Sequence, residues 1–289
     1  MAWRHHLSRD RPHLRGAEVD TPPQLRWEVG SNAARDRCPP RAWPMNPYHD
    51  QDGATIYHGE ALAALASLAN DSVDALVTDP PYSSGGQFRG DRTASTREKY
   101  VDTRDTLGRL DFAGDNRDQR SFGYWCALWL AECLRIVKPS GTAALFADWR
   151  QLPTTTDALQ AGGWVWRGVA AWDKTEAARP RKGAFRNQCE FLAWGTNGAA
   201  RADGPCLPGV WRASARSEER HHIAAKPESV MKGVLAIVPA GGVVLDPFMG
   251  SGTTLVAARD LGLRAIGIET IEANCEIAAK RLAQGVLFA

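Results

Sequence analysis

From Tyr57 onward, short apolar runs of strand length alternate with amphipathic stretches of helical spacing, and this alternation limits the possible folds most. Val73–Thr78 has the length and apolar character of a buried strand. Tyr124–Val137 has helical spacing and is followed by Pro139 and Gly141, which end a helix. Such alternation predicts an α/β, doubly wound, mostly parallel sheet with helices on both faces. Further strands are expected at Thr142–Phe146, Trp164–Trp172, Phe191–Trp194, Val243–Leu245 and Ala265–Ile268, and further helices at Glu60–Leu68, Leu152–Ala161, Pro227–Val238, Thr253–Leu261 and Ile271–Leu282.

Composition narrows the class of protein. The 289 residues include 35 Lys and Arg against 33 Asp and Glu, so any surface for nucleic acid must be local. The six cysteines are scattered without a C-x-x-C pair and the histidines lack metal-ligand spacing, so we expect neither a metal nor a disulfide framework. No apolar run reaches the roughly 18 residues of a membrane span, and no signal peptide is recognisable, which predicts a cytoplasmic protein without a membrane partner.

Residues 1–44 differ from the rest of the chain. They contain eight arginines and six prolines and show no sustained apolar period. Such a segment buries too little surface to offset its ordering entropy. We therefore expect residues 1–44 to be a poorly ordered extension, with a basic DNA-binding arm as the alternative, and residues 45–289 to form the functional domain.

The first candidate site is Asp79-Pro80-Pro81-Tyr82, which directly follows the strand expected at Val73–Thr78. Ligands of open α/β sheets bind beyond the carboxyl ends of the strands. The two prolines stiffen the backbone, Asp79 offers a carboxylate acceptor and Tyr82 offers a flat ring. The tetrapeptide therefore predicts a site for a planar group that carries an amine, and the alternative is an ordinary surface turn.

The second candidate site is the glycine-rich run after Val243–Leu245. Glycines at this place let the backbone approach a ligand and let the following helix pack close to the sheet. About twenty residues further on, the apolar run Ala265–Ile268 ends in Glu269, the position of the acid that binds ribose in dinucleotide folds. The alternative for Glu269 alone is a solvated residue at a strand end. The run itself consists of Asp246, Pro247, Phe248, Met249, Gly250, Ser251, Gly252, Thr253 and Thr254.

Together, these two motifs resemble those of the amino-group DNA methyltransferases, which combine D-P-P-Y with F-x-G-x-G. The order here, with D-P-P-Y first, resembles the permuted β class of that family, and the resemblance covers about residues 55–285. It implies a seven-stranded, Rossmann-like methyltransferase sheet. Shorter matches are Gly59-Glu60, Trp172-Asp173-Lys174, Asn187-Gln188-Cys189-Glu190 and Ala225-Lys226-Pro227, the last preceded by His221 and His222 where the family's usual segment is H-P-T-Q-K-P.

The resemblance implies roles for the two motifs. Asp79 and the Pro80 carbonyl would accept hydrogen bonds from the target amine, with Pro81 in the same turn, and Tyr82 would stack on the base. The implied cofactor is S-adenosyl-L-methionine, and Glu269 would bind its ribose. The implied cofactor residues are Glu60, Asp79, Lys226, Asp246, Pro247, Phe248, Gly250, Gly252, Thr253, Thr254 and Glu269.

The implied chemistry is physically coherent. An exocyclic amine is a poor nucleophile because its lone pair is delocalised into the ring, and hydrogen bonds to both of its hydrogens favour a pyramidal nitrogen. The methyl group of a sulfonium is already activated, so positioning supplies much of the remaining catalysis without a metal. In a duplex the nucleotide must be flipped out, and Tyr82 would replace the lost stacking.

Partner contacts are expected in two regions. Residues 83–120 lack a clear period and read as a mobile loop over the site, and about residues 175–220 read as the region that contacts DNA and recognises the target. A homodimer is also expected, since it would enlarge the reading surface. The alternative for each basic residue is a solvated charged loop. The candidate residues for phosphate contact are Lys174, Arg179, Arg181, Lys182, Arg186, Arg212 and Arg216.

The sequence therefore predicts a site-specific methyltransferase that acts on the N6 amine of adenine in double-stranded DNA. N4-cytosine methylation shares the machinery, and Asp rather than Ser at position 79 favours adenine. Methylation of RNA or of a protein glutamine fits the motif order less well. An NAD-dependent oxidoreductase would explain the glycine loop and Glu269 but not Asp79–Tyr82, and a non-catalytic DNA-binding protein would not need the glycine loop.

Overall fold

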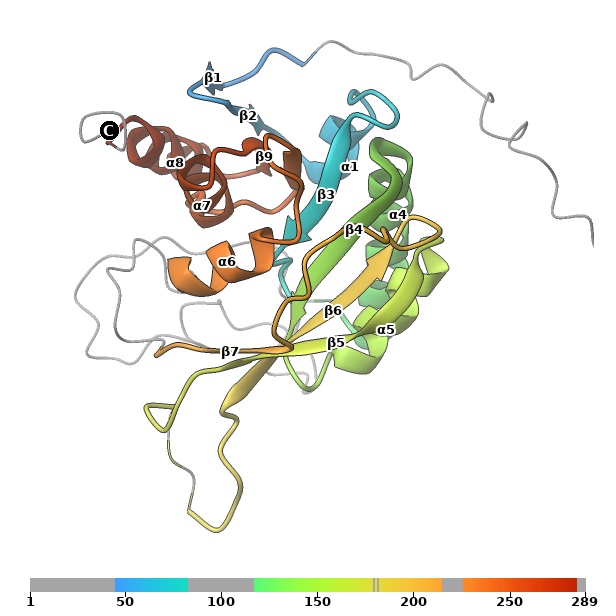
Figure 1. The fold of residues 1–289 in the computed structure, drawn as a ribbon, viewed down its shortest axis with the longest axis vertical. Helices are drawn as coiled ribbons and strands as arrows, with labels where there is room; N and C mark the ends of the chain where they lie inside the picture. The colour runs from blue at the N-terminus through green and yellow to red at the C-terminus, as the bar shows by residue number, and fades with distance from the viewer. Residues whose placement is uncertain (1–44, 83–116, 179, 181, 215–225, 285–289) are drawn as a thin grey trace, which may run out of the picture. The chain divides into compact units, whose positions relative to one another are not determined.

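The computed structural model describes residues 45–82, 117–178, 180, 182–214 and 226–284. Within these ranges, nine strands form one sheet in the order β1-β2-β9-β8-β3-β4-β6-β5-β7 (Figure 1). The five strands from β2 to β4 in that order run parallel, and β6 runs antiparallel to both of its neighbours. The strands are β1 (His49–Gln51), β2 (Ala54–His58), β3 (Val73–Thr78), β4 (Val137–Ala147), β5 (Val165–Asp173), β6 (Cys189–Thr196), β7 (Val210–Arg212), β8 (Val243–Asp246) and β9 (Arg264–Glu269).

Helices cover both faces of the sheet, and each face has its own hydrophobic core. Buried side chains of α1, α4 and α5 pack on one face around Trp129, and those of α6, α7 and α8 pack on the other around Met231 and Leu255 (Figure 1). This arrangement confirms the predicted doubly wound α/β fold. The helices are α1 (Ala61–Leu65), α4 (Gln119–Ile136), α5 (Leu152–Ala161), α6 (Glu228–Leu235), α7 (Thr253–Asp260) and α8 (Glu272–Gln284).

The sheet is wider than the seven strands that the resemblance implies, because short strands extend both edges. β1 and β2 form a hairpin through Asp52 and Gly53, whose φ angles are 54° and 73°. An Asp-Gly pair is a strong hairpin signal because both positions need positive φ, so this hairpin has a signal in the sequence although it was not among the expected elements. At the other edge, β7 consists of three residues that pair with β5, of which Val210 and Arg212 are exposed, and so short a strand leaves no pattern of its own.

β4 begins earlier than its sequence predicts. The strand was expected at Thr142–Phe146, yet it starts at Val137, directly after α4, and passes Pro139 and Gly141. Val137 pairs with Val73 of β3, and the register shifts before Thr142. A distant side chain stabilises this start, because Asn197 Nδ2 donates to the Val137 carbonyl oxygen at 2.7 Å. A contact between residues 60 positions apart leaves no local pattern.

The carboxyl ends of β2, β9, β8, β3 and β4 meet at one edge of the sheet because these strands are parallel. The antiparallel β6 begins at the same edge, where Phe191 pairs with Ala147, the last residue of β4. Residues that follow the parallel strands therefore lie at the same edge of the sheet as residues at the start of β6. Within the described ranges, no helix has the length and apolar character needed to cross a membrane.

Candidate active site

The two sequence motifs meet at this edge because β3 and β8 are hydrogen-bonded neighbours. Leu76 of β3 pairs with Leu245 of β8, so Asp246 at the end of β8 and Asp79 just after β3 lie at the same edge of the sheet. Thr78 Oγ1 donates to Asp246 Oδ1 at 2.7 Å and ties the two strand ends together. Segments that are far apart in the chain thus form one site.

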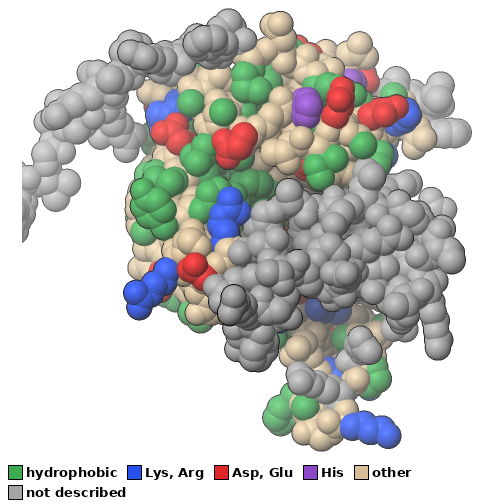
Figure 2. Space-filling model, turned by 180° about the vertical axis from the view of Figure 1, so that it is seen from behind, with side chains coloured by type: hydrophobic (Ala, Val, Ile, Leu, Met, Phe, Trp, Pro, Cys, Tyr) green, Lys and Arg blue, Asp and Glu red, His purple; other side chains and the backbone are tan. Residues whose placement is uncertain are grey.

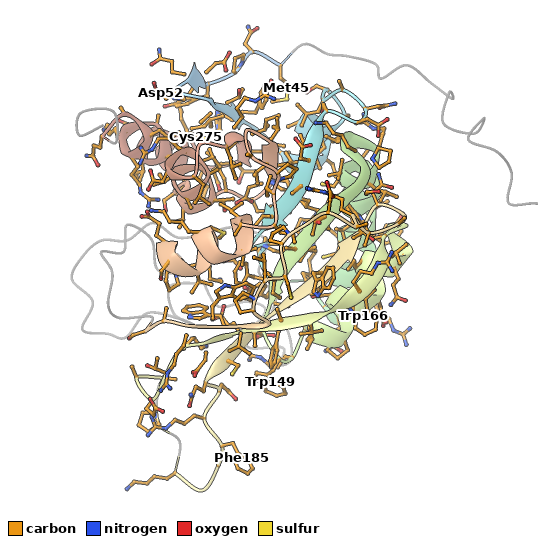
Figure 3. The ribbon with its side chains drawn as sticks, viewed as in Figure 1. Met45, Asp52, Trp149, Trp166, Phe185 and Cys275 are labelled. Carbon is orange, nitrogen blue, oxygen red and sulfur yellow. The ribbon has the colours of Figure 1, made fainter. Side chains whose placement is uncertain are left out.

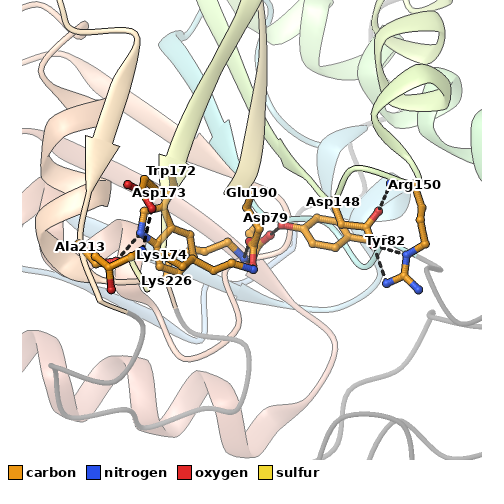
Figure 4. A network of polar contacts seen from close by, with 11 residues as sticks. Asp79, Tyr82, Asp148, Arg150, Trp172, Asp173, Lys174, Glu190, Ala213 and Lys226 are labelled. Atoms are coloured by element: carbon orange, nitrogen blue, oxygen red, sulfur yellow. Dashed lines mark hydrogen bonds and ion pairs between the residues drawn. The ribbon is translucent and has the colours of Figure 1, made fainter. Parts of the chain in front are cut away.

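Both carboxylate oxygens of Asp79 are engaged (Figure 4). Oδ1 accepts a hydrogen bond from the Tyr82 hydroxyl, and Oδ2 forms an ion pair with the Lys226 ammonium group. Burial raises the pKa of Asp79, and Lys226 opposes that rise. Burial and the neighbouring Asp79 hold the pKa of Tyr82 well above its ordinary value, so Tyr82 stays a neutral phenol. Asp79 can therefore act as a partly buried acceptor whose orientation is set by two donors.

Lys226 is the most buried charge of this cluster, with a side chain that is 6% exposed. Its Nζ lies 3.3 Å from Glu190 Oε2 and 5.3 Å from the ring centroids of Tyr82 and Phe146. Burial lowers the pKa of Lys226, but the carboxylates of Asp79 and Glu190 outweigh it and raise that pKa above its ordinary value. Lys226 is therefore a permanent cation at this edge, and its expected contact with a cofactor remains a prediction.

Glu190 joins the site from β6. In the sequence it stood out only as the last residue of Asn187-Gln188-Cys189-Glu190, one of the short segments that resemble the family. Its Oε1 lies 3.3 Å from Lys174 Nζ, so Glu190 bridges two lysines (Figure 4). Although burial raises the pKa of Glu190, Lys226 and Lys174 lower it below its ordinary value. The available signal was an acid at the start of an otherwise mostly apolar strand.

The glycine loop has a backbone that side chains would obstruct. Gly252 precedes α7 with φ of 81°, and an added Cβ would lie 2.7 Å from the Ala278 Cβ atom. Gly250 has φ of 53° and open space on its Cβ side, and its N–H donates to Glu269 Oε2 at 3.1 Å. Glu269 Oε1 also accepts from the Ile271 N–H at 2.8 Å. The loop is thus shaped around Glu269 and leaves room beside Gly250.

Three of the expected cofactor residues direct their polar side chains into the protein. Asp246 is 2% exposed, and its Oδ2 accepts from Thr254 Oγ1 at 2.5 Å. Burial raises the pKa of Asp246 to about 6. Thr253 Oγ1 accepts from Arg281 of α8 at 3.3 Å. These side chains hold the loop in place, and Pro247 between them is buried.

Phe248 and Tyr82 lie at the same edge of the sheet but pack on different faces. The Phe248 ring contacts Trp125 and Trp129 of α4, with centroids 5.2 and 5.1 Å apart. Tyr82 packs against the core on the α6–α8 face. The candidate site therefore extends across the end of the sheet from one face to the other.

Glu60 lies at the end of β2, beside the end of β9, because the Gly59 N–H donates to the Glu269 carbonyl oxygen at 2.9 Å. Glu60 also caps α1, since its Oε2 accepts from the Ala63 N–H at 3.0 Å. One side chain thus stabilises a helix start and remains exposed next to the glycine loop. Its expected contact with the cofactor stays a prediction.

Several of the basic side chains expected to contact DNA phosphate already have partners within the protein. Arg212 pairs with Glu176 at 2.8 Å, the Arg186 guanidinium donates to the Glu176 carbonyl oxygen, and Lys174 pairs with Glu190. Lys182 is exposed on the arm between β5 and β6. Arg179, Arg181 and Arg216 lie outside the described residues, as does the expected loop up to residue 116.

Two exposed aromatic side chains near this edge were missed by the sequence analysis. Phe185 is 97% exposed on the arm between β5 and β6, where basic side chains also lie (Figures 2 and 3). Trp149 is 52% exposed just after β4 (Figure 3). Trp129, Trp164 and Trp172, by contrast, are buried in the core.

Comparison with known proteins now defines the family. The model of the N6/N4 DNA methylase family matches residues 73–280, and the chain belongs to this family of DNA methylases. The type II methyltransferase M2.LlaDCHI of Lactococcus lactis subsp. cremoris is 25% identical over 264 residues, which cover 84% of this chain and 94% of that protein.

Two solved structures show the same fold. The complex of M1.HpyAVI with S-adenosylmethionine superposes with a TM-score of 0.57 and 24% identity, and covers 79% of this chain and 98% of that chain. The cytosine-N4-specific PvuII DNA methyltransferase gives a TM-score of 0.60 at 14% identity, and covers 83% of this chain and 96% of that chain. Both likenesses concern the fold alone.

Proposed function

We propose that this DNA methylase transfers a methyl group from S-adenosyl-L-methionine to the N6 amine of adenine in double-stranded DNA, after the base is flipped out. The observation that carries the proposal is the partly buried Asp79 carboxylate, which accepts a hydrogen bond from Tyr82 directly after β3, the neighbour of the strand that leads into the glycine loop. The order of the two motifs supports assignment to the permuted β class, and Asp at position 79 supports adenine.

The residues at the edge fit S-adenosyl-L-methionine. The open side of Gly250 leaves room for a ligand, and the carboxylate of Glu269 suits ribose hydroxyls. Phe248 and the Pro247 backbone would flank the methionine part, with the α7 start at Gly252, Thr253 and Thr254 below it and Glu60 near the adenine. The cofactor, when bound, supplies an electrophilic methyl group on a sulfonium.

The chain's own residues would prepare the amine. Asp79 and the Pro80 carbonyl accept its two hydrogen bonds, which increases the availability of the nitrogen lone pair, while Pro81 keeps the turn stiff. Tyr82 stacks on the flipped base and, as a neutral phenol, keeps its hydrogen bond to Asp79. The contribution of this cluster is orientation in a partly dehydrated setting.

DNA binding is proposed for the arm between β5 and β6 and for the surrounding basic residues. Lys182 is available for phosphate, and Phe185 provides an apolar group of the kind that other proteins insert between base steps. Arg186 and Arg212 would have to leave Glu176 to contact DNA. A homodimer would place a second arm on the duplex, so a palindromic target is expected.

The proposal is tested by incubating the protein with duplex DNA and radiolabelled S-adenosylmethionine, followed by nucleoside digestion. We expect N6-methyladenine, whereas N4-methylcytosine would refute the base assignment. Asp79→Asn should abolish transfer while cofactor binding persists, and Asp203→Asn is the control because Asp203 is exposed and forms its ion pair with Arg201, away from the site. Thermal stabilisation by NAD instead of S-adenosylmethionine would favour the oxidoreductase.

A further inference from the structure

The ion cluster behind Asp79 goes beyond what the proposed chemistry requires. Lys226 comes from the segment before α6 and Glu190 from β6, and neither contact follows from the D-P-P-Y motif itself. Lys226 and Glu190 have side chains that are 6% and 19% exposed. Buried charges are costly unless they are paired, so these two residues need a reason to be there.

We propose that Glu190 is a positioning residue for methyl transfer: it holds the ammonium group of Lys226 in place, and Lys226 in turn orients the Asp79 carboxylate and keeps it ionised. This inference rests on the proposed function. Asp79 remains the residue that touches the amine. Lys226 and Glu190 act on the amine through Asp79.

Geometry supports the chain of contacts. Lys226 Nζ reaches one oxygen of Asp79 while Tyr82 reaches the other, so the carboxylate plane is set from two sides. Glu190 prevents Lys226 from leaving, because its Oε2 lies 3.3 Å from Nζ and its own position is set by Lys174. A carboxylate has about four acceptor positions, so both donors can stay while the amine binds.

Electrostatics gives the second reason. A protonated Asp79 would offer the amine one acceptor oxygen fewer, and burial raises the pKa of Asp79. Lys226 is the cation that opposes this rise, whereas Glu190 adds to it. The two residues therefore have opposite effects on the ionisation of Asp79 and the same effect on its orientation. Among the residues that the structure describes, the charged or titratable groups that face this cluster are Tyr82 after β3, Asp148 after β4, Lys174 after β5, Glu190 on β6, Lys226 before α6 and Asp246 on β8.

Because Lys226 lowers and Glu190 raises the pKa of Asp79, replacing each of them should have a different effect on the pH profile. The experiment measures kcat against pH for the full chain with duplex DNA. In Glu190→Gln, kcat should fall about 10- to 100-fold, as expected for a misplaced reacting group. Its acid limb should stay in place or move to lower pH, and its Kd for S-adenosylmethionine should stay within about threefold of wild type. In Lys226→Met, the acid limb should move up by about 1 to 3 pH units. In Lys226→Arg, which keeps the positive charge, the acid limb should lie at its wild-type pH again.

Lys232 provides the matched control. It also lies between two carboxylates, with Nζ 2.8 Å from both Glu228 and Asp260, but outside the site. Lys232→Met should leave kcat and the pH profile unchanged. If Lys226 had a purely structural role, the loss of kcat in Lys226→Met would follow its loss of unfolding free energy, and the acid limb of its pH profile would not move.

A carboxyl NMR titration of the free protein separates this inference from the proposed function. The resonance of Asp79, assigned with Asp79→Asn, should titrate at higher pH in Lys226→Met than in wild type. Wild-type kcat in Glu190→Gln, or an unshifted Asp79 titration in Lys226→Met, would overturn the inference. A wild-type protein that binds S-adenosylmethionine but methylates no DNA would instead contradict the proposed function.

Discussion

Replacing Thr254 with Val tests how the glycine loop is anchored. Thr254 is 3% exposed, and its hydroxyl donates to Asp246 Oδ2 at 2.5 Å. Val has nearly the same shape, so the change removes little packing; it removes the hydrogen bond to Asp246 and a long contact of 3.8 Å from the hydroxyl to the Met231 sulfur. The remaining donors to Asp246 are Thr78 Oγ1 at 2.7 Å and the Phe248 N–H at 3.1 Å. The carboxylate stays buried with two donors instead of three.

The expected loss follows from the charge of the acceptor. A hydrogen bond to a charged group contributes about 1.5 to 3 kcal/mol, so Thr254→Val should lower the free energy of unfolding at pH 8 by about 2 kcal/mol. For a domain of this size, that corresponds to a Tm lower by about 4 to 8 °C. Urea unfolding followed by tryptophan fluorescence measures the difference.

The pH dependence gives the sharper test. The pKa of Asp246 is about 6 in the folded protein, above its ordinary value of 3.8, because of burial. The folded state therefore binds this proton more tightly, so the Asp246 contribution to stability is full below pH 4 and falls by about 3 kcal/mol as pH rises through 6. Thr254 stabilises the ionised form. Removing the Thr254 hydroxyl should therefore raise the pKa of Asp246 further. The stability lost in Thr254→Val should be smaller at pH 5, where Asp246 is mostly protonated, than at pH 8.

Thr156→Val is the control for this prediction. Thr156 is 8% exposed and donates to the uncharged Pro153 carbonyl oxygen at 2.9 Å within α5. Its loss should be about 1 kcal/mol and the same at both pH values. An equal penalty for Thr254→Val at pH 5 and pH 8, or one below about 0.5 kcal/mol, would show that Asp246 does not depend on this hydroxyl.

Three further outcomes are expected. Gly252→Ala should destabilise the protein by about 2 kcal/mol or more, since φ is 81° and the new Cβ would lie 2.7 Å from the Ala278 Cβ atom; calorimetry showing wild-type stability would contradict this. Exposed Cys206 should react with a thiol reagent in the native state, whereas Cys133, whose pKa burial raises well above its ordinary value, should react only on unfolding, as absorbance of the released reagent would show. Lys182→Ala should reduce the salt dependence of DNA binding by about one unit of slope, and an unchanged slope would exclude a phosphate contact.

Much of the fold could be read from the sequence because its strands and helices carry strong local patterns. The burial of β3, β8 and β9 shows as short apolar runs, and the ends of these strands are marked by Asp79, Asp246 and Glu269. The edge hairpin β1–β2 was also readable, from Asp52 and Gly53. β7 was not, because a strand of three residues, two of which are exposed, is too short to show a periodicity.

The sequence by itself determined which residues carry a proline turn and a glycine loop, and that both follow strands of a parallel sheet. Only the tertiary structure decided that Lys226 and Glu190 stand behind Asp79, because these contacts depend on the order of strands in the sheet. β6 runs antiparallel beside β4, which brings Glu190 to the carboxyl edge, and Lys226 reaches Asp79 across 147 positions of the chain. Local patterns report burial and turns, whereas pairing between distant charges is settled only when the strands assemble.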